Sequence, residues 1–400
     1  MNSFTNSALR LLRSLLGAPS RSTGPYVGTI TTLDGNTAVA VTEAGISETV
    51  ALAASYPADA ANLGWRCEQY RHGDNSQGAV LGSLAAESPR GALAAASGLS
   101  LSGSRAVCFL SGPDLASSLD LLTAAAGRHL PLVAHIANRA LPNHSNSLGS
   151  GHEALHLAAD CGCFVLFASN VQEAVDFYMV ARHVAEQALI PGLVFMDGEQ
   201  TALSMQELRL PPGELTKQFL GAADDEIPAA TPAQRFLFGD TRRRIPRWHN
   251  PDRPAMLGGL QTTESWGLGR AAHQVFYQQH LVECLNQAFT KFEQLTGRNR
   301  RPLSTHRMED AKLVLVVQGA AIETAETVAD GLRRHYKCKV GVLGVRVLRP
   351  FPGAEIARLL GRNCRVCVLE RLDSPAESDP PLLRELRSSL GRAMDNGRHG

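Results

Sequence analysis

The chain has 400 residues, 44% of them hydrophobic, and a formal net charge of +1. This length and composition indicate a soluble globular protein with two or three domains. A nearly neutral chain is not drawn by its overall charge to nucleic acid or to an anionic membrane surface. No apolar run approaches the ~20 residues of a transmembrane helix, and no signal peptide precedes the eight cysteines, so we expect a cytoplasmic protein without a membrane span.

Residues 1–29 are predicted to form an N-terminal amphipathic helix and a linker. In ALRLLRSLL (8–16) the leucines fall on one helical face, with Arg10 and Arg13 elsewhere. The following GAPSRSTGP has the composition of a linker. The sequence leaves open whether this is a docking helix or a surface helix without a role.

Residues 30–215 alternate short apolar runs with helix-like stretches. The runs are too short for ordinary helices and indicate parallel strands buried on both faces: LPLVAHIA (130–137), CFVLFAS (163–169) and GLVFMDG (192–198). The helix-like stretches are SSLDLLTAAAGR (117–128) and VQEAVDFYMVARHVAEQAL (171–189). This alternation predicts an α/β domain with a doubly wound parallel sheet.

Residues 216–265 lose this rhythm and are predicted to be a connector packed across the surface. Their basic cluster is interpreted as a solvated linker or a partner-facing rim: Arg242, Arg243, Arg244 and Arg247.

A second, smaller α/β domain is predicted over 266–380, with a tail over 381–400 that is expected to be frayed. A long helix is expected first, over Gly267–Thr296, and another over Glu323–Tyr336. Strands are expected over 312–319, 339–348 and 365–371. We interpret the strand-to-helix turn QGAAIET (318–324) as a packing feature, because one glycine is weak support for phosphate binding.

Two cysteine pairs raise the question of a metal. Cys364 and Cys367 form a lone CxxC inside NCRVCVLER, an apolar run that indicates a buried strand, and Cys161 and Cys163 precede the apolar FVLF. No second pair follows at the spacing of a zinc or iron–sulfur site. We therefore predict structural core thiols, no metal site and no iron–sulfur cluster in this chain.

Several motifs, in one order, resemble those of the pyruvate:ferredoxin (2-oxoacid:acceptor) oxidoreductases. They are DGNTA and YP within 31–57, FASNVQEAVDF (167–177), LVFMDGEQT (193–201), HNPDRPAMLGGLQT (249–262), LTGR (295–298) and VGVLGVRVLRPF (340–351). The resemblance covers roughly residues 30 to 380. It implies the pyrimidine-binding-type α/β domain of a thiamine enzyme, followed by a domain like the C-terminal domain of transketolase.

The resemblance also implies where a site would lie. Arg139, in NRAL, matches the family's substrate-binding arginine, and its fork suits the carboxylate of a 2-oxoacid. The alternative is an arginine at a strand end that pairs with a local acid. The positions that match the pyrimidine side of the cofactor site are Tyr56, Pro57, Asp59, Gly112 and Pro113.

Three departures from the family pattern put this site in question. The family's cofactor-activating glutamate falls on Pro89, whose side chain can neither donate nor accept a hydrogen bond, and Glu87 is the candidate substitute if the loop is remodelled. Asp59 stands where the family has threonine, and its charge would repel a 2-oxoacid carboxylate. His152 and Glu153 stand where aspartate and histidine are expected.

The chain contains no GDG motif, which in the family opens the diphosphate- and metal-binding half of the site. The resemblance therefore implies that thiamine diphosphate and Mg are shared with a partner subunit that also carries the iron–sulfur clusters. Ferredoxin or flavodoxin would take the electrons through that complex, a homo- or hetero-oligomer.

Two functions follow from the resemblance. One is an α-type subunit in the oxidative decarboxylation of a 2-oxoacid such as pyruvate, inactive alone. The other is a non-catalytic scaffold or regulatory descendant with a degenerate thiamine site. The sequence does not decide which 2-oxoacid is used, or whether the chain is a truncated product.

Overall fold

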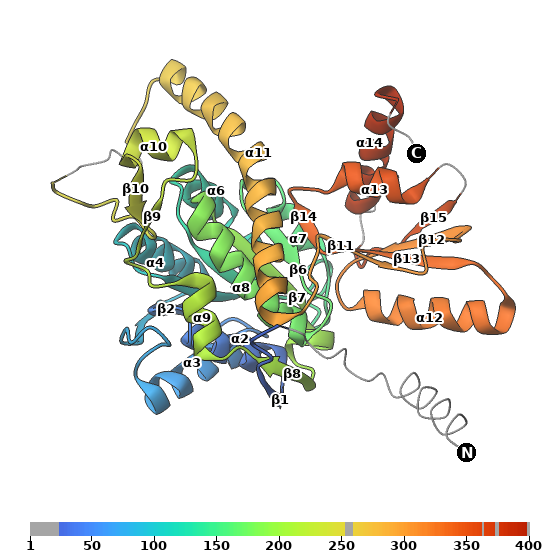
Figure 1. Cartoon of the computed structure of the whole chain (residues 1–400), viewed down its shortest axis with the longest axis horizontal. Coiled ribbons are helices and arrows are strands. Elements are labelled where there is room, and N and C mark those ends of the chain that lie inside the picture. The colour runs from blue at the N-terminus through green and yellow to red at the C-terminus, as the bar shows by residue number, and fades with distance from the viewer. Residues whose placement is uncertain (1–23, 253–258, 362–363, 373–375, 398–400) are drawn as a thin grey trace.

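The computed structural model describes residues 24–252, 259–361, 364–372 and 376–397, with the backbone alone over 272–279. Two α/β units follow one another along the chain, each built around its own sheet (Figure 1). Residues 8–16 of the predicted N-terminal helix lie outside the described residues. No helix in the described part of the chain has the length and apolar content needed to cross a membrane.

The first sheet has seven strands in the order β14-β6-β7-β5-β4-β2-β3. Their bounds are Thr49–Leu52 (β2), Gly82–Ala85 (β3), Ala106–Ser111 (β4), Val133–Asn138 (β5), Phe164–Phe167 (β6), Gly192–Asp197 (β7) and Val347–Arg349 (β14). All neighbours are parallel except β14, which is antiparallel to β6. Every residue of β4, β5, β6 and β7 is buried. For β5, β6 and β7 this confirms the prediction, made from their apolar runs, of strands covered on both faces.

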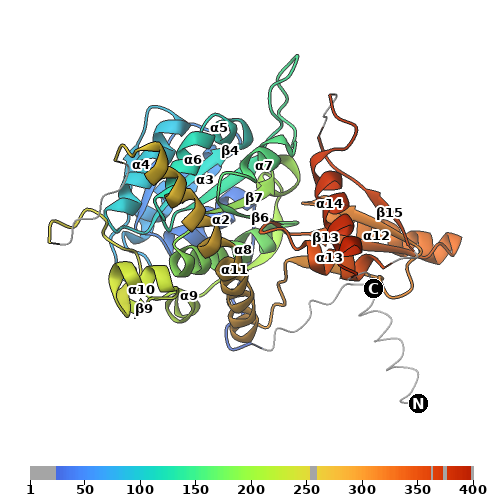
Figure 2. The same cartoon turned by 90° about the horizontal axis from the view of Figure 1, so that it is seen from above.

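Helices cover the two faces of this sheet with two separate apolar layers. One layer contains Trp65, Tyr178 and Phe289, and its helices are α2 (Gly35–Ala44), α3 (Asp59–His72), α8 (Val171–Ala188), α9 (Gly213–Leu220) and α11 (Thr263–Thr296). The other contains Leu93 and Leu122, and its helices are α4 (Pro89–Leu101), α5 (Gly112–Ala116), α6 (Leu119–Gly127) and α7 (Glu153–Ala158). This is the doubly wound arrangement that the alternation predicts. Figure 2 shows α11 crossing the first unit beside α8.

Smaller elements complete the first unit. Strands β1 (Thr29–Leu33) and β8 (Gln206–Leu210) form an antiparallel pair, and a π-helix, η1 (Gly198–Ala202), follows β7 directly. The predicted connector contains β9 (Glu226–Pro228), α10 (Pro232–Phe238) and β10 (Thr241–Arg243), with β9 and β10 paired.

The interpretation of the basic cluster as a solvated rim is wrong for two of its members. Arg242 is 3% exposed and Arg244 is 9% exposed. Arg242 donates to the carbonyl oxygens of Glu186 (2.6 Å) and Arg244 (2.7 Å), and Arg244 donates to that of Ala222 (3.1 Å). Arg242 and Arg244 therefore hold the connector against the end of α8 through Glu186. They also supply the donors that buried carbonyl groups need.

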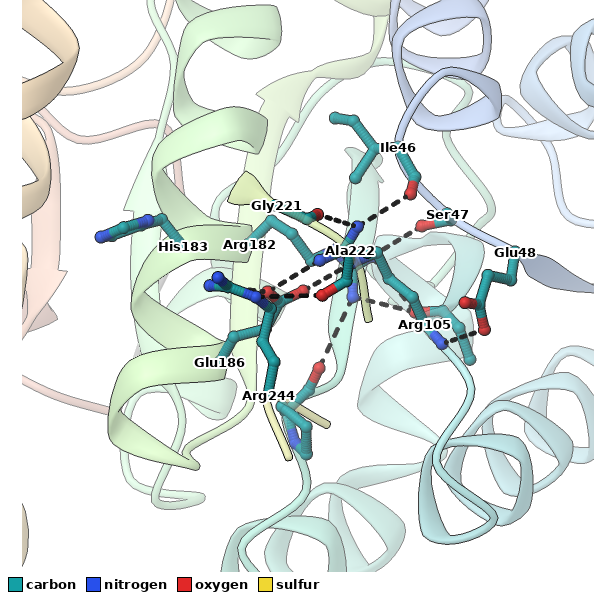
Figure 3. A network of polar contacts seen from close by, with 12 residues as sticks. Ile46, Ser47, Glu48, Arg105, Arg182, His183, Glu186, Gly221, Ala222 and Arg244 are labelled. Atoms are coloured by element: carbon teal, nitrogen blue, oxygen red, sulfur yellow. Dashed lines mark hydrogen bonds and ion pairs between the residues drawn. The ribbon is translucent and has the colours of Figure 1, made fainter. Parts of the chain in front are cut away.

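A buried polar network joins the amino ends of the central strands to α8 (Figure 3). Arg105, which immediately precedes β4, makes two hydrogen bonds of 2.7 and 3.0 Å to the Glu186 carboxylate and donates to the carbonyl oxygens of Ile46 and Gly221. Arg182 lies one helical turn before Glu186 and pairs with Glu43 at 3.3 Å. All four charged side chains are fully buried. The two pairs fix how α8 lies against the sheet.

The second unit has a four-stranded sheet in the order β11-β13-β12-β15. The strands are β11 (Leu303–His306), β12 (Leu313–Val317), β13 (Val340–Val345) and β15 (Arg365–Val368), and only β11 is antiparallel to its neighbour. Helix α12 (Ala321–Tyr336) packs on one face, and α13 (Gly353–Leu360) and α14 (Pro381–Asp395) pack on the other.

The predicted strand over 339–348 divides at Arg346. Its first part is β13, in the middle of the second sheet, and its continuation is β14, at the edge of the first. Arg346 is held at the crossing point: its carbonyl oxygen accepts from Phe167 N at 2.7 Å, and its guanidinium pairs with Glu173 of α8. The two units therefore share one continuous stretch of chain.

Two expectations about the end of the chain are wrong. Residues 381–395 are not frayed but form α14, because Leu382 and Leu386 bury against α13 and the second sheet. The run around Cys367 is not a buried strand either: β15 is the edge of its sheet, and Arg365, Val366 and Cys367 are exposed.

Candidate functional site

The carboxyl ends of β2, β4, β5 and β7 meet at one edge of the first sheet, the edge where ligands of open α/β sheets bind. The loops that follow them are in close contact. A Cβ on Gly112 would lie 2.4 Å from the carbonyl oxygen of Arg139, and one on Gly198 would lie 2.8 Å from that of Asn138 and 3.4 Å from the Pro57 ring. Only glycine fits at either position. The structure thus brings together Tyr56, Pro57, Gly112 and Arg139, as predicted from their positions in the motifs.

Arg139 has no counter-ion in the described part of the chain. Its guanidinium carbon lies 6.0 Å from the centre of the Tyr56 ring, and its buried Nε has no hydrogen-bond partner there. Other half-buried arginines differ, since Arg298 and Arg300 both pair with Asp176. The pairing with a local acid that the sequence left open is not seen. The Arg139 fork is free to bind a carboxylate through two charge-assisted hydrogen bonds.

The turn after β2 is held by carboxylates rather than left open. Ser55 N donates to Asp59 Oδ1 at 2.8 Å, and Ser111 N donates to Ser55 Oγ at 2.8 Å. The Asp114 carboxylate accepts from both serine hydroxyls. Asp59 therefore braces the loop that carries Tyr56, a role the sequence did not suggest. Asp114, in the SGPDL turn, is a positioning residue of the same loop.

Pro89 is the first residue of helix α4, and Glu87 lies two residues before it. Ser88 caps the helix by accepting from Gly91 N at 3.1 Å, and Pro89 occupies the first turn, where its missing N–H costs nothing. Glu87 is exposed, and its Oε1 lies 2.7 Å from where a Cβ on Gly91 would stand. The carboxylate is therefore folded onto the positive end of α4. The structure thus places Pro89 and Glu87 at the start of α4, and it places Arg139 and Tyr56 beside one another at the carboxyl edge of the sheet.

His152 belongs to the junction between the units, and the site prediction missed its partner, Asp197. Glu153 follows His152 as the first residue of α7. His152 Nε2 donates to one Asp197 oxygen at 3.1 Å, and Ala320 N, at the start of α12, donates to the other at 2.8 Å. All three polar groups are buried or half-buried. The turn QGAAIET therefore packs against the first unit, as the sequence analysis expects, and the Asp197 carboxylate lies at the amino end of α12, where negative charge is favourable. Asp197 could have been found from the sequence, because it lies at the carboxyl end of a run that predicts a buried strand.

A second polar pair lies beside this junction. His156 Nε2 is 3.8 Å from Glu370, whose carboxylate accepts from Leu382 N and Leu383 N at the start of α14. Burial, helped by the charge of His152, lowers the pKa of His156 to about 3, and burial raises the pKa of Glu370. His156 is therefore neutral near pH 7, so the pair is not a charged salt bridge.

We predict that Asp197→Ala lowers the free energy of unfolding by about 3 kcal/mol, because two hydrogen bonds to a buried carboxylate are lost. Urea denaturation monitored by circular dichroism measures this. Asp160→Ala, at an 89% exposed side chain, is the matched control and should change little. Equal stability of the Asp197→Ala variant and the unmodified chain would contradict the role of Asp197 at the junction.

In the described part of the chain, no three His, Cys, Asp or Glu side chains are grouped so as to hold a metal ion. Cys161 and Cys163 are buried, and burial raises the pKa of the Cys163 thiol, which confirms core thiols at this pair. The same prediction is wrong for Cys364 and Cys367, which are half-buried and exposed because β15 is an edge strand.

Comparison with known proteins identifies relatives of both units. Residues 69–262 match the family model "Pyruvate flavodoxin/ferredoxin oxidoreductase, thiamine diP-bdg", and 311–397 match "Pyruvate:ferredoxin oxidoreductase core domain II". The pyruvate-flavodoxin oxidoreductase of Trichormus variabilis is 27% identical over 366 residues, 90% of this chain and 29% of that protein. The pyruvate synthase subunit PorA of Thermotoga maritima is 29% identical over 306 residues, 76% of this chain and 72% of PorA.

A solved structure shares the fold. It is the 2-oxoglutarate:ferredoxin oxidoreductase from Magnetococcus marinus with 2-oxoglutarate, coenzyme A and succinyl-CoA bound. Its TM-score is 0.61 at 15% identity, covering 90% of this chain and 65% of that one.

The first unit, which is doubly wound and whose loops meet at the carboxyl edge, carries the match to the thiamine-diphosphate-binding family model, and the smaller α/β unit carries the match to the core-domain model. The chain therefore belongs to the pyruvate:ferredoxin (2-oxoacid:acceptor) oxidoreductase family. It spans about 30% of the length of the curated oxidoreductases that it matches over more than nine-tenths of itself.

Proposed function

We propose that the chain is the α-type, pyrimidine-side subunit of a 2-oxoacid:ferredoxin or flavodoxin oxidoreductase, with pyruvate as the simplest substrate. The observation that carries the proposal is Arg139: a half-buried guanidinium with no counter-ion among the residues that the structure describes, at the carboxyl edge of the sheet and beside Tyr56. A cation in that setting is stabilised by an anionic ligand.

In the proposed reaction the substrate loses CO2, its remaining acyl group passes to the thiol of coenzyme A with release of the thiol proton, and two electrons leave singly for the acceptor. Thiamine diphosphate supplies the carbon nucleophile and the electron sink when it is bound. The residues of this chain bind and orient the substrate. Arg139 holds the carboxylate, Tyr56 shields it from water, and the Asp59 and Asp114 carboxylates hold the Tyr56 loop in place.

A partner subunit is part of this proposal. The described residues offer no acid at the family position and no metal-binding group. The partner would supply the diphosphate and Mg half of the site and the iron–sulfur clusters, so this chain would carry no cluster and would act only in a cytoplasmic homo- or hetero-oligomer.

Replacing Arg139 with Ala tests the substrate role. In the assembled complex, loss of the bidentate contact should raise the KM for the 2-oxoacid tenfold or more, since each charge-assisted hydrogen bond contributes roughly 1.5 to 3 kcal/mol. Steady-state kinetics with pyruvate measures this. Arg66→Ala, at an exposed position on α3, is the control and should leave KM unchanged. An active complex whose KM does not respond to Arg139→Ala would contradict the assignment.

A specific observation also favours the second function, a scaffold or regulatory subunit. Pro89 is built into α4 as a helix-starting residue, and the Glu87 carboxylate is turned onto Gly91. In this alternative, Arg139→Ala changes only the stability of the complex. Pro89→Glu together with Asp59→Thr then distinguishes the two, because raised turnover indicates a catalytic subunit with a weakened site.

We predict that the isolated chain binds thiamine diphosphate with Mg²⁺ only weakly, with a Kd above about 100 μM. The reason is that it lacks the GDG motif and has Pro89 in place of the acid. Isothermal titration calorimetry measures this directly. A micromolar or tighter constant for the chain alone would contradict the prediction and would remove the need for a partner in cofactor binding.

A further inference from the structure

The edge of the second sheet is unusually apolar. Strand β15 pairs with β12 on one side only, and no strand of the described residues lies on its other side. Val366 is 38% exposed and Leu369 is 48% exposed. Natural edge strands are commonly protected by charges, proline or bulges along the strand, and between Arg365 and Glu370 this one carries only valine, cysteine and leucine.

The backbone of β15 is available on that side. Arg365 N donates to Lys312 O at 2.8 Å and Leu369 N donates to Val316 O at 2.9 Å, so these groups face β12. Because the direction of backbone groups alternates along a strand, the N–H and C=O groups of Val366 and Val368 face outward. They form a template for one more strand.

The amino end of this edge is positively charged. Lys312 lies between Lys339 and Arg365 at the starts of three adjacent strands, with backbone hydrogen bonds linking all three residues. Asp310 pairs with Lys339 at 3.3 Å. The other two cations, Lys312 and Arg365, form no ion pair with any described residue.

We propose that the β15 edge docks an extended acidic strand of a partner protein. Main-chain hydrogen bonds to Val366 and Val368 would give affinity, and the unpaired cations beside them would select negative charge. The surface belongs to the second unit (Figure 1) and does not depend on the proposed activity.

Charge argues against one other occupant. Residues 1–29 contain three arginines and no acidic residue, so the N-terminal segment of this chain carries the same sign as the surface. A second copy paired edge to edge about a two-fold axis would run antiparallel and would set the cations of each copy opposite the other's carboxyl end, so light scattering tests this occupant.

The experiment uses the full chain and a fluorescein-labelled peptide of alternating glutamate and valine, seven residues long, followed by fluorescence anisotropy. We expect saturable binding that weakens as salt is added. A lysine–valine peptide of the same length, and the acidic peptide with proline at its centre, should not bind.

Two variants locate the binding. Val366→Pro removes an outward N–H without removing a bond to β12, and proline is tolerated on edge strands. It should weaken binding about tenfold or more, whereas Val366→Thr, the matched control, should bind like the unmodified chain. Lys312→Glu combined with Arg365→Glu should also weaken binding about tenfold.

Several results would overturn the proposal. They are no binding of the acidic peptide to the full chain, equal binding of the lysine peptide, or binding that does not respond to Val366→Pro. A dimer in light scattering that Val366→Pro dissociates would assign the edge to a second copy instead. Competition by a synthetic peptide of residues 1–23 would assign it to the N-terminal segment.

Discussion

Lowering the pH from 7.5 to 5 is expected to reduce the free energy of unfolding by up to about 6 kcal/mol through His135, which is buried, and His156 and His183, which are half-buried. His135, on β5, packs against Phe109 and Tyr178, and neither ring nitrogen has a described partner. His183 stacks on Phe219. Burial lowers the pKa of each of these two, and of His156, to about 3.

The sign of this effect follows from where the protons bind. In the unfolded chain these histidines have a pKa near 6.5, so they take up protons as the pH falls below that value, whereas the folded chain keeps them neutral until about pH 3. Protons therefore favour the unfolded state throughout this interval, by about 2 kcal/mol per histidine at pH 5. Total stabilities of domains are about 5–15 kcal/mol, so this loss approaches unfolding.

Urea denaturation at pH 7.5, 6 and 5, followed by circular dichroism, measures the slope. His135→Gln removes the titrating group and should reduce the loss by about one third, or about 2 kcal/mol. His144→Gln, at an exposed loop position, is the control and should leave the slope unchanged. A free energy of unfolding that stays constant from pH 7.5 to 5 would show that these histidines are not buried in neutral form.

Replacing Arg105 with Met is expected to lower the free energy of unfolding by about 3–5 kcal/mol, because it leaves the Glu186 carboxylate buried without its main partner. Glu186 is fully buried, and its nearest other cation, Arg244, is 3.9 Å away. The carbonyl oxygen of Gly221 also loses the Arg105 donor, while that of Ile46 keeps Asn75 Nδ2 at 3.4 Å. The effect therefore combines an unpaired charge with the loss of hydrogen bonds to two backbone groups.

The matched control is Arg90→Met. Arg90 also makes two hydrogen bonds to one carboxylate, that of Asp120, but both side chains are at the surface, where ion pairs contribute little. The double variant Arg105→Met with Glu186→Leu should regain part of the loss, since replacing a buried pair with apolar groups is often tolerated. Equal midpoints of urea unfolding for Arg105→Met and Arg90→Met would show that burial does not decide the strength of the Arg105 pair.

The parts of the fold that the sequence predicts are those set by local patterns. Strands β5, β6 and β7 and helix α8 lie within about three residues of their expected bounds, because a run of apolar residues must be buried wherever it is placed. Neighbouring residues in the sequence predict neither the pairing of β14 with the first sheet nor the burial of Arg105. Arg105 follows a short loop and immediately precedes β4, and its burial is explained only by its pairing with Glu186 of α8, far along the chain.

Some residues of the candidate site could likewise be placed from the sequence, and others could not. Arg139, Tyr56 and Gly112 could be placed from motifs, because the carboxyl ends of neighbouring parallel strands always meet. Asp59 bonds to a backbone N–H of its own turn and Asp114 bonds to a hydroxyl group of another loop, so their roles depend on how the turns fold. No pattern in the sequence records that geometry.

The passage of β14 into the first sheet has a consequence for biosynthesis. Strand β6 is made early, but the strand that covers its outer edge leaves the ribosome only after α8, α11 and β13. A nascent chain therefore exposes an open sheet edge while most of the remaining protein is still being translated, when bare edges promote aggregation. For the same reason, a gene cut between the two units would deprive the first of its last strand, so recombination at that point should yield an insoluble product.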